Sequence, residues 1–168
     1  MRQRFLLILL LGLCCLGMGK KKLPLSVRFY TQALKQDSED TGSFAVPVTL
    51  LNGQQTYVDE IAAISEHDIA GIYPFPVADG TGGCAFKLDD HGTIGLDTLS
   101  MAKRGTLLIA TIDGRQVADI MIDRRVPDGI VTIPSGITTD EMQQMLKKFY
   151  VIGGKKKAKK KDTYSAGF

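Results

Sequence analysis

The most informative segment of the 168-residue sequence is TLLIATIDGRQVADIMI, residues 106–122. Thr106–Ile112 is a continuous apolar run, and Gln116–Ile122 is a second run that returns from it. Asp113-Gly114 between them is a strong hairpin signal, because both central positions of the favoured two-residue turn need positive φ. The segment therefore predicts a β-hairpin whose first strand is apolar enough to be buried on both faces.

Helix signals flank this hairpin on both sides. Before it, Asp89-Asp90-His91-Gly92 can cap a helix that ends near Gly105 and places Leu96 and Leu99 on one face. After it, Thr138–Glu141 has the spacing of a capping box, and the following apolar residues recur at helical spacing: Met142, Met145, Leu146 and Phe149. Two helices are therefore expected, one before and one after the hairpin.

Short strands are expected around these elements. Cys84–Leu88 and Ile130–Ile133 are apolar runs of strand length, and Leu25–Thr31 alternates apolar and polar residues. Asn52-Gly53 predicts a tight turn between two further strands, Ala45–Leu51 and Gln55–Val58.

The segment between these strands and Cys84 contains a second kind of signal. Ser65–Asp68 also has capping-box spacing and predicts a short helix or a turn. Ile69–Val77 is apolar but contains Pro74 and Pro76, and these two prolines exclude a central position in a sheet.

Together these elements predict an α+β fold with a mixed or antiparallel sheet and two helices on one face, in a ferredoxin-like split arrangement. We expect one domain over residues 23–152, after a signal peptide at 1–19 and before a disordered lysine-rich tail at 153–168. A hydrophobic content of 44% supports one small core. The length of 168 residues and the composition together exclude a multidomain enzyme, a collagen-like fibre and a mostly disordered acidic chain.

The formal net charge of +3 conceals an uneven distribution. Basic residues cluster at Arg2 and Arg4, at Lys20–Lys22 and near the C-terminus, whereas the stretch between Leu23 and Gly154 is acidic. The C-terminal cluster is the candidate surface-binding site, and its members are Lys155, Lys156, Lys157, Lys159, Lys160 and Lys161. Such a run repels itself and predicts a disordered tail, which either solubilises the protein or binds an anionic surface.

The N-terminal residues have the organisation of a secretory signal peptide. A basic Met1–Arg4 precedes the apolar run Phe5–Leu16, and Gly17-Met18-Gly19 supplies the small residues of a cleavage site. The run is shorter than the ~20 residues that a membrane-spanning helix needs. We therefore expect an exported, periplasmic or extracytoplasmic protein without a transmembrane helix in the mature chain.

A lipoprotein signal with lipid on Cys14 or Cys15 is the alternative to this interpretation. That processing favours a small residue before the modified cysteine, whereas Leu13 and Cys14 occupy those positions. If the signal peptide is removed, Cys84 is the remaining cysteine and has no partner for an internal disulfide. We expect Cys84 to be a small buried hydrophobic residue.

The sequence gives no catalytic, cofactor-binding or metal-binding set, so we expect a protein that is not an enzyme and has no cofactor. His67 and His91 lie in different local settings, without the spacing of metal ligands. Gly80–Gly83 is rich in glycine but lacks the lysine and hydroxyl of a phosphate-binding loop. Asp123 next to Arg124 and Arg125 indicates a surface ion pair.

Residues 84–145 resemble the extracytoplasmic head, or P1-like, domain of SecD, the protein-export membrane protein. That family has an apolar strand, a helix ending in a basic residue and glycine, and a strand of the form LAIVLDG. The counterparts here are Cys84–Leu88, Thr93–Gly105 and TLLIATIDG at Thr106–Gly114. A returning strand, an I-x-G segment and an F-T-x-E-E-A helix start follow in the family. Here they correspond to Gln116–Ile122, Ile130–Gly136 and the segment 137–142.

The resemblance implies a head-like domain that contacts other polypeptides of the envelope or the export pathway. SecD also has transmembrane helices that carry proton-coupled export, and this sequence shows no counterpart to them. Residues 23–78 and the lysine tail of this sequence, in turn, have no counterpart in the family's pattern. The leading hypothesis is an exported, non-catalytic, protein-binding accessory module of the cell envelope, contacting its partners through Thr106–Ile122 and the Gly-rich loop beside Cys84. The alternative is an envelope-associated structural protein held to anionic membrane surfaces by its lysine tail. Export and the acidic body argue against nucleic acid as a partner.

Overall fold

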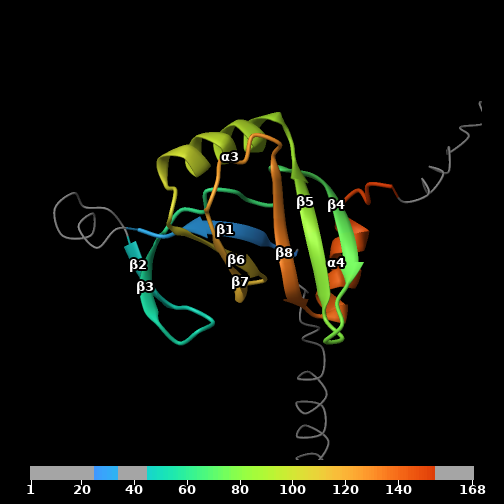
Figure 1. Ribbon diagram of the computed structural model, residues 1–168. Helices are drawn as coiled ribbons and strands as arrows, with labels where there is room; N and C mark the ends of the chain where they lie inside the picture. The colour runs from blue at the N-terminus through green and yellow to red at the C-terminus, as the bar shows by residue number, and fades with distance from the viewer. Residues whose placement is uncertain (1–24, 34–44, 154–168) are drawn as a thin grey trace, which may run out of the picture.

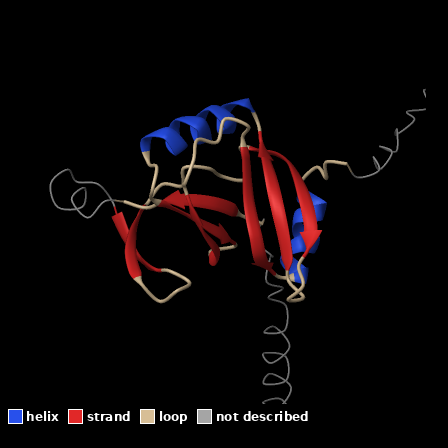
Figure 2. Cartoon of the chain, viewed as in Figure 1, coloured by secondary structure: helices blue, strands red, loops and turns tan. Residues whose placement is uncertain are grey.

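Eight strands and two helices form an α+β fold in the computed structural model, which describes residues 25–33 and 45–153 (Figures 1 and 2). The predicted α+β class is confirmed. The strands are β1 (Val27–Thr31), β2 (Ala45–Thr49), β3 (Gln55–Asp59), β4 (Ile69–Pro76), β5 (Gly82–Leu88), β6 (Leu107–Ile112), β7 (Arg115–Met121) and β8 (Ile130–Ile137). The helices are α3 (Asp90–Ala102) and α4 (Thr139–Lys148).

The predicted hairpin is formed by β6 and β7. Asp113 and Gly114 have φ values of 50° and 79°, as the two-residue turn requires, and Ile112 faces Arg115 across it. A register shift follows between Ala110 and Thr111, so the strand bends there. Four of the six β6 residues are buried, which confirms the expectation for its apolar run.

The strands divide into two three-stranded sheets and one separate hairpin. The orders are β1-β6-β7 and β4-β5-β8, and β2 pairs with β3. Every ladder is antiparallel, and one isolated parallel bridge joins Ile72 to Val151. The β2–β3 hairpin packs on the first sheet through a small cluster of Leu50, Val58 and Ile109.

The main core lies between the two sheets and the helices. Phe29 of β1 and Phe86 of β5 meet edge to face, with ring centroids 5.6 Å apart. Leu96 of α3 and Met145 of α4 belong to the same buried cluster, so both helices pack on one core. Figure 1 shows α3 along one end of the strands and α4 beside β4.

Strand β4 lies at a sheet edge, as its prolines predict. Ile72 donates its N–H to the Tyr150 carbonyl at 2.8 Å and accepts from the Ile152 N–H at 2.9 Å, so its main chain points away from β5. Pro74 and Pro76 lie two and four residues after Ile72, so their backbone nitrogens also point away from β5. Neither proline therefore removes a donor from the β4–β5 ladder. The prolines therefore leave the β4–β5 ladder intact.

Several expectations fall on residues that the structure does not describe. The signal peptide at 1–19, the polar loop at 36–43 and the lysine tail beyond Gly153 all lie outside the described ranges. Within those ranges, neither helix has the length and hydropathy needed to cross a membrane.

Candidate functional site

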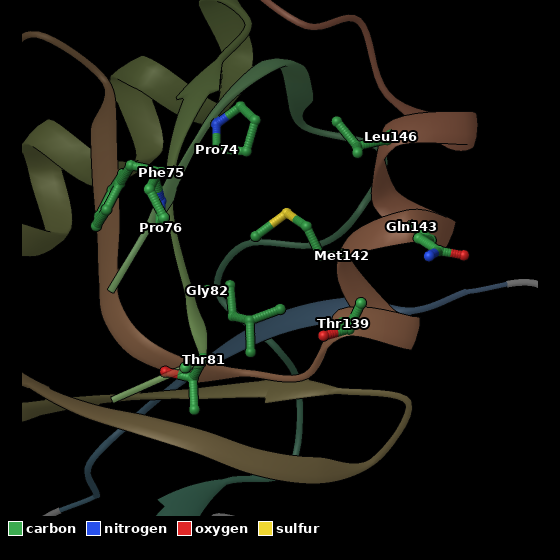
Figure 3. A pocket seen from close by; sticks show the side chains of 11 residues that line it. Pro74, Phe75, Pro76, Thr81, Gly82, Thr139, Met142, Gln143 and Leu146 are labelled. Atoms are coloured by element: carbon green, nitrogen blue, oxygen red, sulfur yellow. The ribbon is translucent and has the colours of Figure 1, made fainter. Parts of the chain in front are cut away.

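The first candidate site is a groove between the β4–β5 turn and α4, which we call the α4 groove (Figure 3). Its volume is about 350 Å³, and most of its lining is apolar. Figure 3 shows Met142 and Leu146 projecting from the helix toward the strands. The lining residues are Pro74, Phe75, Pro76, Gly80, Thr81, Gly82, Ile137, Thr139, Met142, Gln143 and Leu146.

Glycine residues allow the walls of the α4 groove to approach. A Cβ on Gly82 would lie 2.7 Å from the Cε atom of Met142, and one on Gly83 would lie 2.1 Å from the Phe75 ring. Thr81 fixes the turn, because its hydroxyl accepts from the Gly136 N–H at 2.9 Å. Thr81 also donates to Asp79 through its N–H and its hydroxyl, and these two bonds hold the pKa of Asp79 below its usual value. The Gly-rich loop therefore serves as one wall of a groove.

The second candidate site is a cavity of about 500 Å³ between β7 and β8, which we call the β7–β8 cleft. Its sides are formed by 120–122 at the end of β7 and 130–132 at the start of β8, and the connecting residues 123–128 complete it. Leu96 and Ser100 of α3 also line it. The Ser100 hydroxyl accepts from the Val126 N–H at 2.9 Å, which ties the connecting loop to the helix.

The two strands touch at the other end of this cleft. Arg115 Nη2 donates to the Gly136 carbonyl at 2.9 Å, and a Cβ on Gly136 would lie 3.2 Å from the Val117 carbonyl oxygen. No ladder joins β7 to β8, which belong to different sheets. The strands therefore diverge from a shared end, and the cleft occupies the space between them.

Two solved structures of SecDF have a fold similar to that of this chain. One is SecDF, a membrane component that enhances protein export; the TM-score is 0.50 at 12% identity, over 77% of this chain and 64% of that chain. Another is SecDF in a Super-membrane-facing form, with a TM-score of 0.50 at 12% identity. This match covers 77% of this chain and 19% of the SecDF chain. The chain has a SecD-like fold. It spans less than two thirds of the length of either SecDF chain. No family model and no curated protein matches the sequence.

The SecD-like fold extends beyond the segment that carries the sequence resemblance. The sequence resemblance to SecD is confined to residues 84–145, whereas the structural match to SecDF covers 77% of the chain. The hairpin expected to contact partners supplies β7 to the β7–β8 cleft, and the Gly-rich loop lines the α4 groove. Both predicted contact segments therefore border cavities of the fold.

The structure brings one histidine to two carboxylates, which the sequence reasoning missed. His91 Nδ1 lies 3.2 Å from Asp68 Oδ1, and Asp89 completes a group whose ligand-type atoms lie within 4.8 Å of one another. The sequence indicated this group only indirectly, through the strands that follow Asp68 and precede Asp89. The pairing of β4 with β5 places Asp68 beside Asp89, and the Asp89 N–H donates to the Asp68 carbonyl at 2.8 Å. His67 is exposed in the preceding turn and does not join the group.

Local hydrogen bonds account for the positions of these carboxylates. Asp68 accepts from the N–H and the hydroxyl of Ser65, so the segment predicted as a helix or a turn forms a turn. Burial acts to raise the pKa of Asp68, but the bonds from Ser65 and His91 outweigh it and lower the pKa overall. Asp89 accepts from the Gly92 N–H at 2.8 Å and caps α3. These hydrogen bonds therefore hold both carboxylates at the start of the helix.

The remaining residues singled out in the sequence lie elsewhere. Cys84 is fully buried, and this burial raises the pKa of its thiol to about 12. Arg125 pairs with Asp97 of α3 at 2.6 Å rather than with Asp123, because the loop after β7 lies against that helix. The six lysines of the candidate surface-binding site lie beyond Gly153, outside the residues that the structure describes.

Proposed function

We propose that this protein is an exported, non-catalytic module of the cell envelope that binds polypeptide segments. The SecD-like fold supports this proposal, because a SecDF chain of the same fold is a membrane component that enhances protein export. The signal-peptide pattern of residues 1–19 supports an extracytoplasmic location. Function rests on sites rather than folds, so the surface features of this chain carry the rest of the argument.

The observation that carries the proposal is the β7–β8 cleft. It is bordered by the strand that the sequence predicts as a contact element, and Met121 beside it has 62% of its surface exposed. Ile130, which is 37% exposed, lines the same cleft, and exposed apolar residues that gather in one place are typical of sites of protein contact. The α4 groove adds a more apolar surface, where Leu146 is 43% exposed. Both surfaces suit apolar side chains of a polypeptide.

Site-specific photocrosslinking tests this proposal. A benzophenone side chain is placed at Met121 or at Leu146, and control proteins carry it at Ile61 or at Ile94. Ile61 and Ile94 are also exposed and apolar, at 83% and 69%, but neither lines the cleft or the groove. The probe is a small disulfide-bonded protein made permanently unfolded by reduction and carboxymethylation, compared with its native form.

Crosslinks to the unfolded probe are expected at Met121 or Leu146, well above those at the controls and above those to the native form. Equal, low yields at all four positions would contradict polypeptide binding. The same labelled protein, expressed with its own N-terminus and fractionated, tests the location. A chain that retains Met1 and stays in the cytoplasm would contradict export.

A second candidate function rests on the lysine cluster in the sequence. Six lysines within residues 155–161 provide ~1 kcal/mol each near an anionic membrane surface, which is enough for electrostatic attachment. Replacing all six with glutamine is expected to abolish binding to vesicles containing anionic lipid at low salt. Binding that is unchanged by the replacement, or equally strong to zwitterionic vesicles, would contradict attachment through the tail.

A further inference from the structure

Strand edges distinguish the β7–β8 cleft from the outer edges of β1 and β4. The free edge of β1 is covered, because Phe29 donates its N–H to the Ile64 carbonyl at 2.9 Å. The free edge of β4 is paired at Ile72 and lacks N–H donors at Pro74 and Pro76. Exposed strand edges pair readily with other chains, and prolines and covering segments are the usual protection. The outer edges of β7 and β8 have neither protection along the cleft.

The hydrogen-bond alternation shows which groups these edges present. Ile122 donates its N–H to the Thr106 carbonyl, so Met121, one residue earlier, points its N–H and C=O away from β6. Leu88 donates to the Gly129 carbonyl, and by the same alternation Thr132 points its main-chain groups away from β5. No backbone hydrogen bond to either residue from another described segment satisfies these groups. Met121 and Thr132 both line the β7–β8 cleft.

The side chains around these edges suit an extended segment. Ile120 and Val131 line the cleft as apolar residues, and Met121 and Ile130 are 62% and 37% exposed beside them. An extended segment that adds to a sheet places alternate side chains on opposite faces, and pockets for those side chains then confer specificity. The cleft therefore offers main-chain donors and acceptors together with apolar contact.

The charges of the lining determine what kind of segment fits. Asp123 and Asp128 balance Arg124 and Arg125, so the lining has no net charge. Arg125 is also held by Asp97 through two bonds of 2.6 and 2.7 Å. Complementarity of charge attracts partners of opposite sign, and a balanced lining offers no such attraction to a strongly acidic or basic segment. An uncharged segment is the better match.

We propose that the β7–β8 cleft binds an extended, uncharged polypeptide segment by strand addition to the open edges of β7 and β8. The segment pairs main chain to main chain with Met121 and Thr132, over about five residues at the rise of a β-strand. The inference rests on the proposed function, since it specifies how a polypeptide is held and which segments are accepted. Strand addition predicts that the affinity for a segment depends little on its side chains, beyond an alternation of apolar and small polar residues.

Binding of a synthetic peptide to the full chain tests this mode. The probe is the acetylated and amidated peptide Ser-Val-Thr-Val-Ser-Val-Thr with a fluorophore, measured by fluorescence anisotropy. The matched controls are the same peptide N-methylated at every second residue, in each of the two possible registers. N-methylation removes main-chain donors and retains every side chain. Strand addition predicts at least about tenfold weaker binding of the methylated peptides, since each lost bond removes roughly 1 kcal/mol.

Proline substitutions test the same bonds from the side of the protein. Met121→Pro and Thr132→Pro remove N–H donors that the β6 and β5 ladders do not use, so the sheets can remain intact. Met121→Ala and Thr132→Ala are the controls, because they shorten the side chain and keep the donor. We expect at least one proline variant to bind the peptide about tenfold more weakly than its alanine control. Circular dichroism and the unfolding midpoint establish that each variant is folded.

The outcomes separate this inference from the proposed function. Equal binding of methylated and unmodified peptides overturns strand addition, and this comparison needs no variant, so it decides even if a proline variant does not fold. Proline variants that bind like their alanine controls overturn it as well. If crosslinks to unfolded polypeptide persist in either case, the proposed function stands and only the binding mode is wrong. Self-association at the same edges without peptide binding would instead identify a second copy as the occupant and overturn the inference.

Discussion

The buried thiol of Cys84 lies at the centre of the core, paired with Pro74 and Ile133 on the neighbouring strands. Burial raises the pKa of this thiol to about 12, so almost none of it is thiolate at neutral pH. We predict that Cys84 resists alkylation by iodoacetamide in the native state and reacts after denaturation. Peptide mass mapping distinguishes Cys84 from Cys14 and Cys15, which serve as internal references if they are present. Rapid native labelling of Cys84 would contradict the burial.

A polar network at Asp59 ties strand β3 to the end of α3, and no pattern in the sequence indicated it. Lys103 Nζ lies 2.6 Å from Asp59 Oδ2 and 3.0 Å from the hydroxyl of Thr31, and Thr31 also donates to the same carboxylate. Burial acts to raise the pKa of Asp59, but the bonds from Lys103 and Thr31 outweigh it and hold the pKa below its usual value. The network lies at the margin of the core, where Thr31 is buried and the Lys103 side chain is 34% exposed.

Removing the cation from this network is expected to destabilise the protein. Lys103→Met leaves the carboxylate of Asp59 without its charged partner, which should cost about 1 kcal/mol because the pair is partly exposed. Lys147→Met is the matched control, since Lys147 is exposed on α4 and forms no salt bridge with another described residue. Urea unfolding at neutral pH measures both variants. Equal stability of the two would show that the network contributes nothing.

At the scale of elements, the start of α4 is determined by its capping box. The Thr138 hydroxyl accepts from the Glu141 N–H, and the Glu141 carboxylate accepts from the Thr138 N–H at 2.8 Å. We predict that Thr138→Ala lowers the free energy of unfolding by about 1 kcal/mol, the usual effect of losing such a cap. Thr139→Ala at the next, exposed position is the control and should change it little. A larger loss at Thr139 would contradict the capping role.

Elements with local signals were predictable from the sequence, and those that depend on distant neighbours were not. Asp113-Gly114, the box at Thr138 and the prolines of β4 each act within a few residues, and the structure confirms all three. The packing of the β2–β3 hairpin on Ile109 has no such signal, because it joins surfaces far apart along the chain. The β7–β8 cleft is of the same kind, since it exists only where two sheets diverge.

At the scale of the whole molecule, carboxylates fasten elements that are distant in sequence. Asp59 joins β3 to α3, Asp68 lies against His91 of α3, and Glu141 of α4 pairs with Arg115 of β7 at 2.6 Å. For Glu141, as for the other two, burial acts to raise the pKa, but hydrogen bonds, here from Arg115 and Thr138, outweigh it. All three pKa values are therefore lowered in the folded state.

A lowered folded-state pKa has a definite consequence for stability in acid. The stabilisation is fully present above the unfolded-state pKa values of about 4, and it is lost as the pH falls through the lower folded-state pKa values. We predict that the free energy of unfolding is nearly constant from neutral pH to about pH 5 and then declines steadily in acid. The triple variant Asp59→Asn, Asp68→Asn, Glu141→Gln should be less stable at neutral pH and decline less on acidification, because its side chains no longer titrate. Urea unfolding at a series of pH values measures both proteins. Parallel curves would show that acid unfolding is controlled by other carboxylates.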